Sequence, residues 1–281
     1  MSSARFLSEV TQIFDKNLAE DTRFVEVKDV ARLKGLPQDF IDQHKPDENG
    51  IIKISTDWPD YYPVIQYADD GELRHELWMT MMNLGYPKNT AVFKDVLKVR
   101  RDLAQTLGYK NWAWYATEEM MIKNPDNSIA FVDKVSQLAR PSATRDLNEL
   151  LEYKKKLDPA ATVVNPWERA YLSRLVSKEK YDYSQEEVRP YFDMLKVRQG
   201  ILDISSKLYG IEFKRNSEIE VWHESVEVFD VMENGELIGR IYLDLYPRDN
   251  KYKSFAMFPM VPGVKGVRIS EGAIVGNFPD P

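Results

Sequence analysis

Hydrophobic residues recur every three or four positions through much of the chain, the spacing that places side chains on one face of a helix. In the segment 89–108 this apolar stripe comprises Val92, Val96, Val99, Leu103 and Leu107. Asn89 or Thr90 can cap the start of the predicted helix, and Gly108 is expected to end it. A second stripe precedes Gly210 and comprises Met194, Val197, Ile201, Ile204 and Leu208. The pattern predicts a large multi-helix body.

The period of the pattern changes after residue 216. In the segment 225–247 apolar and polar residues alternate, as in a strand, and one side carries Leu237, Gly239, Ile241, Leu243 and Leu245. Asn234-Gly235 separates two such runs and predicts a hairpin, because both central turn positions favour positive φ. The segment 253–261, KSFAMFPMV, is typical of a third strand. We therefore predict a mainly α protein, with a helical domain at 1–216 and a small antiparallel β-sheet region at 217–281.

The chain ends with the residues GAIVGNFPDP, in which a short apolar run at 273–275 precedes Gly276. We interpret this run as a connecting segment that leads into a further element, because a finished domain seldom closes in this way. The chain is therefore expected to correspond to part of a longer protein.

Composition excludes several classes of function. The 281 residues have a net charge of -7, which argues against a nucleic-acid partner, since binding to phosphates needs clustered Lys and Arg. The chain has no cysteine, which excludes disulfides and thiolate metal sites and fits a cytoplasmic protein. No apolar stretch approaches the roughly 20 residues of a membrane span, so no membrane partner is expected.

The three histidines bear on any metal chemistry. His75-Glu76 begins like the zinc motif His-Glu-x-x-His, but Met79 stands where the second histidine would be. Two imidazoles one helical turn apart are needed to share the ion, so His75 is interpreted as an ordinary helix residue. His44 is interpreted as a solvated loop residue. His223 follows Trp222 at the start of the sheet, where it either has a structural role or faces a cleft. We predict no metal site and no catalytic residue in this chain.

Other catalytic motifs are also missing from the sequence. It contains neither a Gly-rich phosphate loop nor a G-x-S-x-G nucleophile elbow. No two carboxylates are singled out as a glycosidase pair, although one sequence does not exclude such a pair. The aromatic cluster around Trp112, Trp114 and Tyr115 is interpreted as core.

A set of segments in a fixed order resembles a known family. These are VWHESV (221–226), a strand and turn from Gly239 to Arg248 that contains YLDLYPR, Lys251-Tyr252, and the apolar run 255–258. NPWERAYL (165–172) and EEVRPYF (186–192) agree with it. In this order they resemble the first part of the thimet oligopeptidase family of zinc metallopeptidases, which includes oligopeptidase A, neurolysin and dipeptidyl carboxypeptidase. Ser254 departs from the family, where several members carry His.

The resemblance implies peptide cleavage by the complete family enzyme and a missing zinc motif in this chain. In the family the match is followed by a helix with His-Glu-Phe-Gly-His, and a later Glu completes the zinc site. The resemblance thus implies the N-terminal half of a two-lobed zincin-like oligopeptidase that cleaves short peptides. Because the 281 residues lack the motif, no cofactor is expected in this chain, and it is predicted to be inactive alone. The alternative is a non-catalytic peptide-binding or scaffold module.

The resemblance also implies that the small sheet lines the substrate groove. Its edge strand would offer the backbone of Phe255, Ala256 and Met257 to an extended peptide. The competing interpretation is a buried or capped edge. An exposed edge favours pairing with another chain, so the possible partners are short peptides, a complementing C-terminal half or a second copy.

Overall fold

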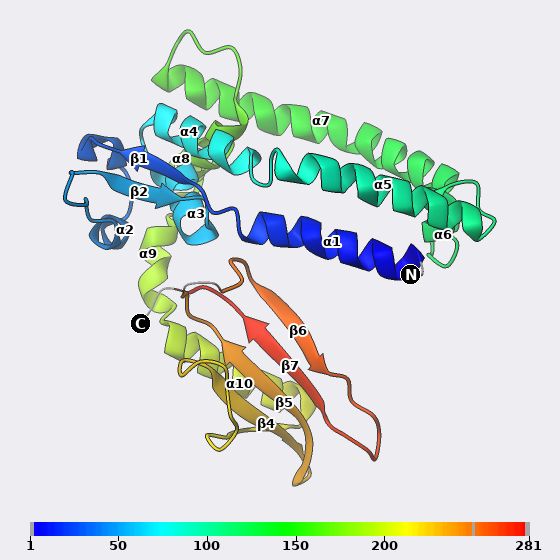
Figure 1. Ribbon diagram of the computed structural model, residues 1–281. Helices are drawn as coiled ribbons and strands as arrows, with labels where there is room; N and C mark the ends of the chain where they lie inside the picture. The colour runs from blue at the N-terminus through cyan, green and yellow to red at the C-terminus, as the bar shows by residue number, and fades with distance from the viewer. Residues whose placement is uncertain (1–2, 249–250, 279–281) are drawn as a thin grey trace. The chain divides into compact units, whose positions relative to one another are not determined.

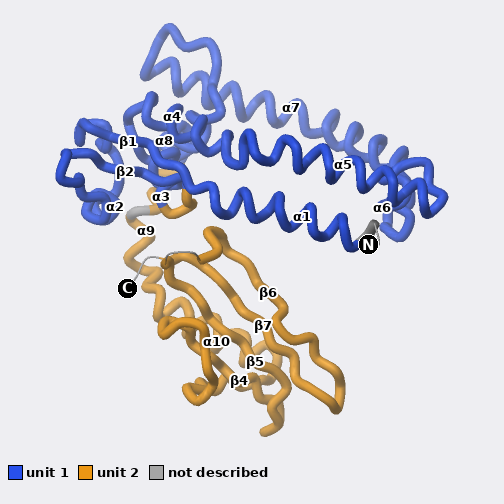
Figure 2. The backbone as a smooth tube through the Cα atoms, in the orientation of Figure 1, with its two compact units in different colours: residues 1–56, 60–180 blue, residues 57–59, 181–281 orange. Residues whose placement is uncertain are grey.

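The computed structural model describes residues 3–248 and 251–278 and divides into two compact units (Figure 2). The first unit contains residues 1–56 and 60–180, and the second contains residues 57–59 and 181–281. The change of period near residue 216 therefore does not coincide with the unit boundary, because the last helices group with the strands. Within the described part of the chain, no helix combines the length and hydropathy that crossing a bilayer requires.

Most of the first unit is helical, in agreement with the predicted fold class (Figure 1). Its helices are α1 (Ser3–Ala19), α2 (Gln38–Gln43), α3 (Trp58–Tyr67), α4 (Gly71–Met82), α5 (Lys88–Thr106), α6 (Trp112–Thr117), α7 (Pro125–Leu157) and α8 (Arg169–Tyr181). The first two residues of α3 and the last residue of α8 are assigned to the second unit. Short 3-10 turns lie at Val30–Leu33 and Pro166–Glu168. The strands β1 (Phe24–Val27) and β2 (Ile52–Ser55) form an antiparallel pair that the hydrophobic pattern did not predict.

The most deeply buried side chains of the first unit come from β1, β2, α3 and α4: Val27, Ile54, Val64, Leu73 and Leu77. Helices α1 and α5 lie side by side. In α5 the predicted stripe is buried at Val96 and Val99. The predicted caps are wrong, because α5 begins at Lys88, ahead of both residues. Asn89 is instead buried and joins the two helices, since its Nδ2 donates to the Phe14 carbonyl at 3.0 Å.

The second unit combines helices with a five-stranded sheet (Figure 1). Its elements are α9 (Gln185–Val188), a 3-10 turn at Arg189–Tyr191, α10 (Met194–Tyr209), β3 (Glu212–Arg215), β4 (Glu227–Glu233), β5 (Glu236–Asp244), β6 (Ala256–Val261) and β7 (Ser270–Val275). The β4–β5 hairpin turns at Asn234 and Gly235, whose φ angles of 50° and 83° confirm the predicted turn.

The strand order is β3-β4-β5-β7-β6. The small sheet is confirmed, but it is mixed: β7 runs parallel to β5, whereas the other pairs are antiparallel. The connection from β5 to β6 leaves one strand position open, and β7 returns from β6 to fill it. The apolar run 273–275, interpreted as a connecting segment, therefore lies in a strand with neighbours on both sides.

Each face of the sheet has its own core. On one face Leu202 of α10 packs with Phe229, Leu243 and Leu245. On the other face Tyr242 packs with residues from β4, β7 and the preceding loop, namely Val226, Val228, Ala273 and Val275. The alternation predicted for β5 is therefore correct. The stripe predicted for α10 is not its buried face, since Ile201, Ile204 and Leu208 are exposed.

Candidate functional site

The predicted peptide-contact residues lie at the start of an edge strand. Phe255 immediately precedes β6, and Ala256 and Met257 are its first two residues. Strand β6 is last in the sheet order and pairs with β7, and none of the described strands pairs with its other side. The side chains of Phe255 and Met257 are 62% and 65% exposed. The chain at this edge can therefore offer both backbone groups and apolar side chains.

Aromatic side chains surround this edge. The rings of Tyr252 and Phe258 meet edge to face, with their centroids 5.3 Å apart. Phe255 and Phe278 form a second edge-to-face pair at 6.2 Å. Such pairs restrain the rings while leaving part of each ring exposed. The surface beside β6 therefore has apolar character.

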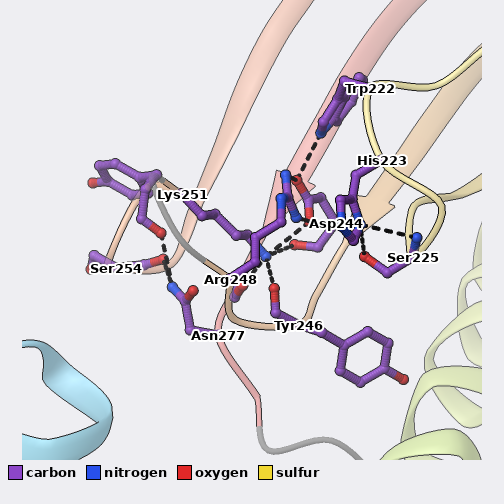
Figure 3. A network of polar contacts seen from close by, with 11 residues as sticks. Trp222, His223, Ser225, Asp244, Tyr246, Arg248, Lys251, Ser254 and Asn277 are labelled. Carbon is purple, nitrogen blue, oxygen red and sulfur yellow. Dashed lines mark hydrogen bonds and ion pairs between the residues drawn. The ribbon is translucent and has the colours of Figure 1, made fainter.

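A buried carboxylate, Asp244, lies at the end of β5 and connects several of the segments that carry the family resemblance. Its carboxylate accepts hydrogen bonds from Trp222 Nε1 at 2.9 Å and from both Arg248 terminal nitrogens at 2.6 and 2.8 Å (Figure 3). Lys251 Nζ lies 2.9 Å from the same carboxylate. The segments containing Trp222, Asp244, Arg248 and Lys251 thus converge on one group.

Lys251 joins three parts of the backbone at this point. Its ammonium group donates to the carbonyls of Asp244, Tyr246 and Gly276, at 3.0, 2.5 and 2.5 Å (Figure 3). Lys251 is itself buried, so its charge must be compensated within the protein. The contacts fix the end of β7 against the end of β5. They also fix the turn that leads toward β6.

The charge states of this cluster follow from its contacts. Burial opposes ionisation of Asp244, but the hydrogen bonds from Arg248, Lys251 and Trp222 hold the pKa of its carboxyl well below the usual range. Burial lowers the pKa of Lys251, and Asp244 opposes that shift. A buried anion held by two cations and an indole stabilises structure, and no substrate group is required to complete it.

The three histidines lie in separate environments. The His75 ring packs against Trp167, with 4.1 Å between ring centroids, as fits a helix residue in a packed position. His223 Nδ1 lies 2.8 Å from Ser225 Oγ and accepts from the Ser225 N–H, which fits the structural interpretation. The interpretation of His44 as solvated is wrong. His44 is partly buried between the Phe40 carbonyl and the Asp60 carboxylate, at 2.8 and 3.1 Å.

The contacts of His44 also affect its protonation. Burial lowers the pKa of His44, but hydrogen bonds to Asp60 and to the Phe40 carbonyl outweigh it and raise that pKa above its ordinary value. The ring thus acts as a donor between the end of α2 and the start of α3. This is a structural role, remote from the edge strand in sequence.

Zinc does not fit the residues that the structure describes. Within residues 3–248 and 251–278, no group of three His, Cys, Asp or Glu side chains is placed to hold a metal ion. Zinc needs three or four such ligands at short range. A zinc site would therefore require ligands from outside the described residues.

Two features of the site had only weak signals in the sequence. Asn277 Nδ2 donates to the carbonyls of Tyr252 and Ser254, at 2.9 and 3.0 Å, and so fixes the backbone just before β6 (Figure 3). The contact at Ser254 is made by its backbone carbonyl and does not involve the side chain, which is the part that differs from the family. Pro259 lies within β6 itself, where a proline is typical of an edge strand. Pro259 is thus a sequence signal for the edge position of β6.

Comparisons with known proteins show which family the chain is similar to. A family profile described as Peptidase family M3 matches residues 64–281. The chain is 32% identical to Oligopeptidase A of Escherichia coli (strain K12) over 260 residues, which are 87% of this chain and 38% of that protein. It is 27% identical to Thimet-like oligopeptidase of Dictyostelium discoideum over 263 residues, 89% of this chain and 39% of that protein. The chain thus spans about two fifths of the length of these relatives.

Proposed function

The chain belongs to peptidase family M3, and from that membership we propose that it forms the N-terminal region of a zinc-dependent oligopeptidase that cleaves short peptides. The names of its relatives, Oligopeptidase A and Thimet-like oligopeptidase, support a peptide substrate. We also propose a cytoplasmic location, which fits a chain that has no cysteine and so forms no disulfide.

The edge strand β6 is the observation that carries this proposal. An unpaired strand edge binds an extended peptide through main-chain hydrogen bonds, which read little of the peptide sequence. This suits an enzyme that accepts many short peptides. We propose that the backbone of the segment Phe255, Ala256 and Met257 makes these contacts, and the exposed side chains of Phe255 and Met257 support this assignment.

We propose that the chain alone does not cleave peptides by zinc chemistry. Its two His-Glu pairs, His75-Glu76 and His223-Glu224, each lack a second imidazole one helical turn later. His75 also packs on Trp167. When bound, zinc polarises a carbonyl and activates water, and its ligands would come from a polypeptide that carries the family motif. The role of this chain would then be to bind and orient the peptide.

A complementing polypeptide would need a surface on which to pack. The exposed stripe of α10, formed by Ile201, Ile204 and Leu208, is one candidate, because these side chains are 59–69% exposed. Exposed apolar stripes of this kind favour association. A second copy of the chain would be the alternative occupant of this surface.

A second candidate function is a non-catalytic peptide-binding or scaffold module. It is favoured by the same edge strand, which needs no metal to bind main chain. The two functions differ in what a complementing polypeptide does. It restores cleavage in the first and has no effect on cleavage in the second.

The test measures zinc content and cleavage of a quenched fluorogenic peptide, by the chain alone and after addition of a polypeptide with the His-Glu-x-x-His region. We expect no zinc and no turnover for the chain alone, and metal-dependent cleavage after addition. A complementing polypeptide with the motif Glu changed to Gln is the matched control and should restore no cleavage. Stoichiometric zinc in the chain alone, or cleavage by it, would refute the inactive assignment. Failure of complementation would favour the binding module.

A further inference from the structure

We propose that the peptide-binding edge of β6 is a window of five residues, from Phe255 to Pro259, and that Pro259 sets its far end. This inference rests on the proposed function, because it concerns how much peptide main chain the same strand accepts. It follows from the direction of backbone groups along β6 and from what closes each end.

Pro259 indicates which backbone groups of β6 face outward. Proline has no N–H, so within a sheet it is found where that position faces away from the neighbouring strand. Pro259 lies opposite Gly272 of β7. Because successive residues of a strand alternate in direction, Phe255 and Met257 also turn their backbone groups outward. Ala256 and Phe258 turn theirs toward β7.

The pairing of β7 with β5 independently shows which backbone groups of β6 face outward. The N–H of Gly276, just after β7, donates to the Asp244 carbonyl on the β5 side at 2.8 Å. By alternation, Ala273 and Val275 direct their backbone groups to the other side, toward β6. There they oppose Phe258 and Ala256. The outward row of β6 therefore consists of Phe255, Met257 and Pro259.

The far end of the window closes at Pro259 for two reasons. Pro259 offers only its carbonyl to an incoming strand, since it has no N–H. The register then shifts, because Pro259 opposes Gly272 and Val261 opposes Glu271, which leaves Met260 as an extra residue. Such a bulge bends the strand and interrupts its edge. Pairing with a peptide cannot continue in the same row beyond this point.

The near end closes where the extended backbone begins. Lys253 and Ser254 form a bend, and β6 starts at Ala256. The Asn277 side-chain amide holds this bend by donating to the carbonyls of Tyr252 and Ser254. The outward row therefore begins at Phe255. At about 3.3 Å for each residue, five residues span roughly 16 Å. The window therefore fits a short extended peptide rather than a long strand.

The side chains along the window define the chemistry of the peptide. Phe255 and Met257 lie on one face of the strand and Phe258 on the other, and they are 62%, 65% and 41% exposed. An added strand would place its own side chains beside these apolar groups on both faces. We therefore assign the site to short extended peptides, among which those with apolar residues at alternate positions should bind more tightly.

The test uses the full chain and fluorescein-labelled peptides of three to eight residues, with alternating Leu and Thr and blocked ends. Anisotropy titrations should show affinity rising to about five residues and then staying level. Pro259→Thr adds one outward N–H, so the eight-residue peptide should bind about five-fold tighter, as one further hydrogen bond allows. Val261→Thr introduces the same side chain without adding an N–H and should change affinity less than two-fold.

A second variant removes an N–H from the outward row of β6 instead of adding one. Met257→Pro removes an outward N–H at the centre of the window and should weaken every peptide by at least about five-fold. The pairing of β6 with β7 should persist, because the inward row is unchanged. Hydrogen exchange at the Ala273 and Val275 amides checks that the strand is still folded.

The possible outcomes distinguish failure of the five-residue window from failure of the proposed peptide binding. If the wild-type chain binds peptides but affinity keeps rising to eight residues, or Pro259→Thr leaves the eight-residue peptide unchanged, the window is refuted and peptide binding stands. If the wild-type chain binds none of the peptides, both fall. A dimer that peptide does not dissociate in sedimentation velocity would assign the edge to a second copy and also overturn the window.

Discussion

Helix α7 and strand β5 differ in how much of the rest of the chain they need. Helix α7 runs for 33 described residues, and none of its side chains is buried. Strand β5 has nine residues and ends in Tyr242, Leu243 and Asp244, all of them buried. A helix forms its backbone hydrogen bonds internally, whereas a strand takes them from its neighbours. Helix α7 can therefore complete its backbone hydrogen bonds with most of its side chains exposed, whereas β5 completes its own only together with β4 and β7.

Two ion pairs, one of α7 and one of β5, also differ in burial. Lys156 of α7 pairs with Glu179 of α8, and both side chains are at least half exposed. Pairs of this kind contribute little to stability. Asp244 at the end of β5 is 2% exposed and pairs with the buried Lys251. Stability should therefore depend more strongly on Asp244 of the sheet unit than on Lys156 of α7.

The largest effect is expected from Asp244→Ala. It leaves the Lys251 ammonium buried without its carboxylate, and loss of one partner of a buried pair costs about 3–5 kcal/mol. Urea unfolding followed by circular dichroism measures this cost. Asp203→Ala, at an exposed position of α10, is the matched control and should change stability by less than about 0.5 kcal/mol. A cost below about 1 kcal/mol for Asp244→Ala would contradict the role of the network.

The same substitution should reveal a dependence of stability on pH. The pKa of Asp244 is held well below its unfolded value of about 3.9, so its contribution to stability is fully present above that value. It declines as pH falls below the unfolded pKa and is lost once pH falls through the lower, folded pKa. The difference in stability between wild type and Asp244→Ala should stay constant above about pH 5 and shrink in stronger acid. Unfolding in urea at a series of pH values measures this difference.

A pair of Leu→Ala substitutions gives the next largest effect. Leu77 of α4 is fully buried, and its truncation should cost about 2–5 kcal/mol through lost burial and the cavity left behind. Leu138 of α7 is 71% exposed, and its truncation should change stability by less than about 0.5 kcal/mol. Thermal unfolding of both variants makes the comparison. A large cost at Leu138 would indicate that α7 is covered by another copy in solution.

A pair of Gly→Ala substitutions should give the smallest effects, of opposite sign. Gly235 has a φ of 83° in the β4–β5 turn, where an L-residue costs about 1–2 kcal/mol. Gly200 lies within α10 and has open space where an alanine methyl group would lie, so alanine there should stabilise by about 0.5–1 kcal/mol. Urea midpoints measured on both variants test the signs. Equal signs would contradict the assigned backbone conformations.

Local features of the fold could be predicted from the sequence. Asn234-Gly235 predicted the hairpin because turn geometry is decided by two adjacent residues. Val96 and Val99 predicted the buried face of α5 because one neighbouring helix covers that face. The segments around Trp222 and YLDLYPR indicated the family, because each of them is a continuous stretch of residues.

Features that depend on distant partners were not predicted. The α10 stripe has the period of a buried face, yet the sheet packs on Leu202 and leaves Ile204 exposed. Asn89 has the residue type of a helix cap but bonds to α1, about 75 positions away. The run 273–275 resembled a connection because nothing in its own sequence shows that β5 and β6 leave a gap for it.

The sequence by itself determined the helices, the hairpin and the family, because these follow from residues that are close along the chain or share one motif. Only the tertiary structure decided the parallel place of β7, the burial of Asp244 with Lys251 and the two ends of the β6 edge. Each of these depends on backbone groups and charges that are separated in sequence and interact only after the strands have paired, so no local period records them.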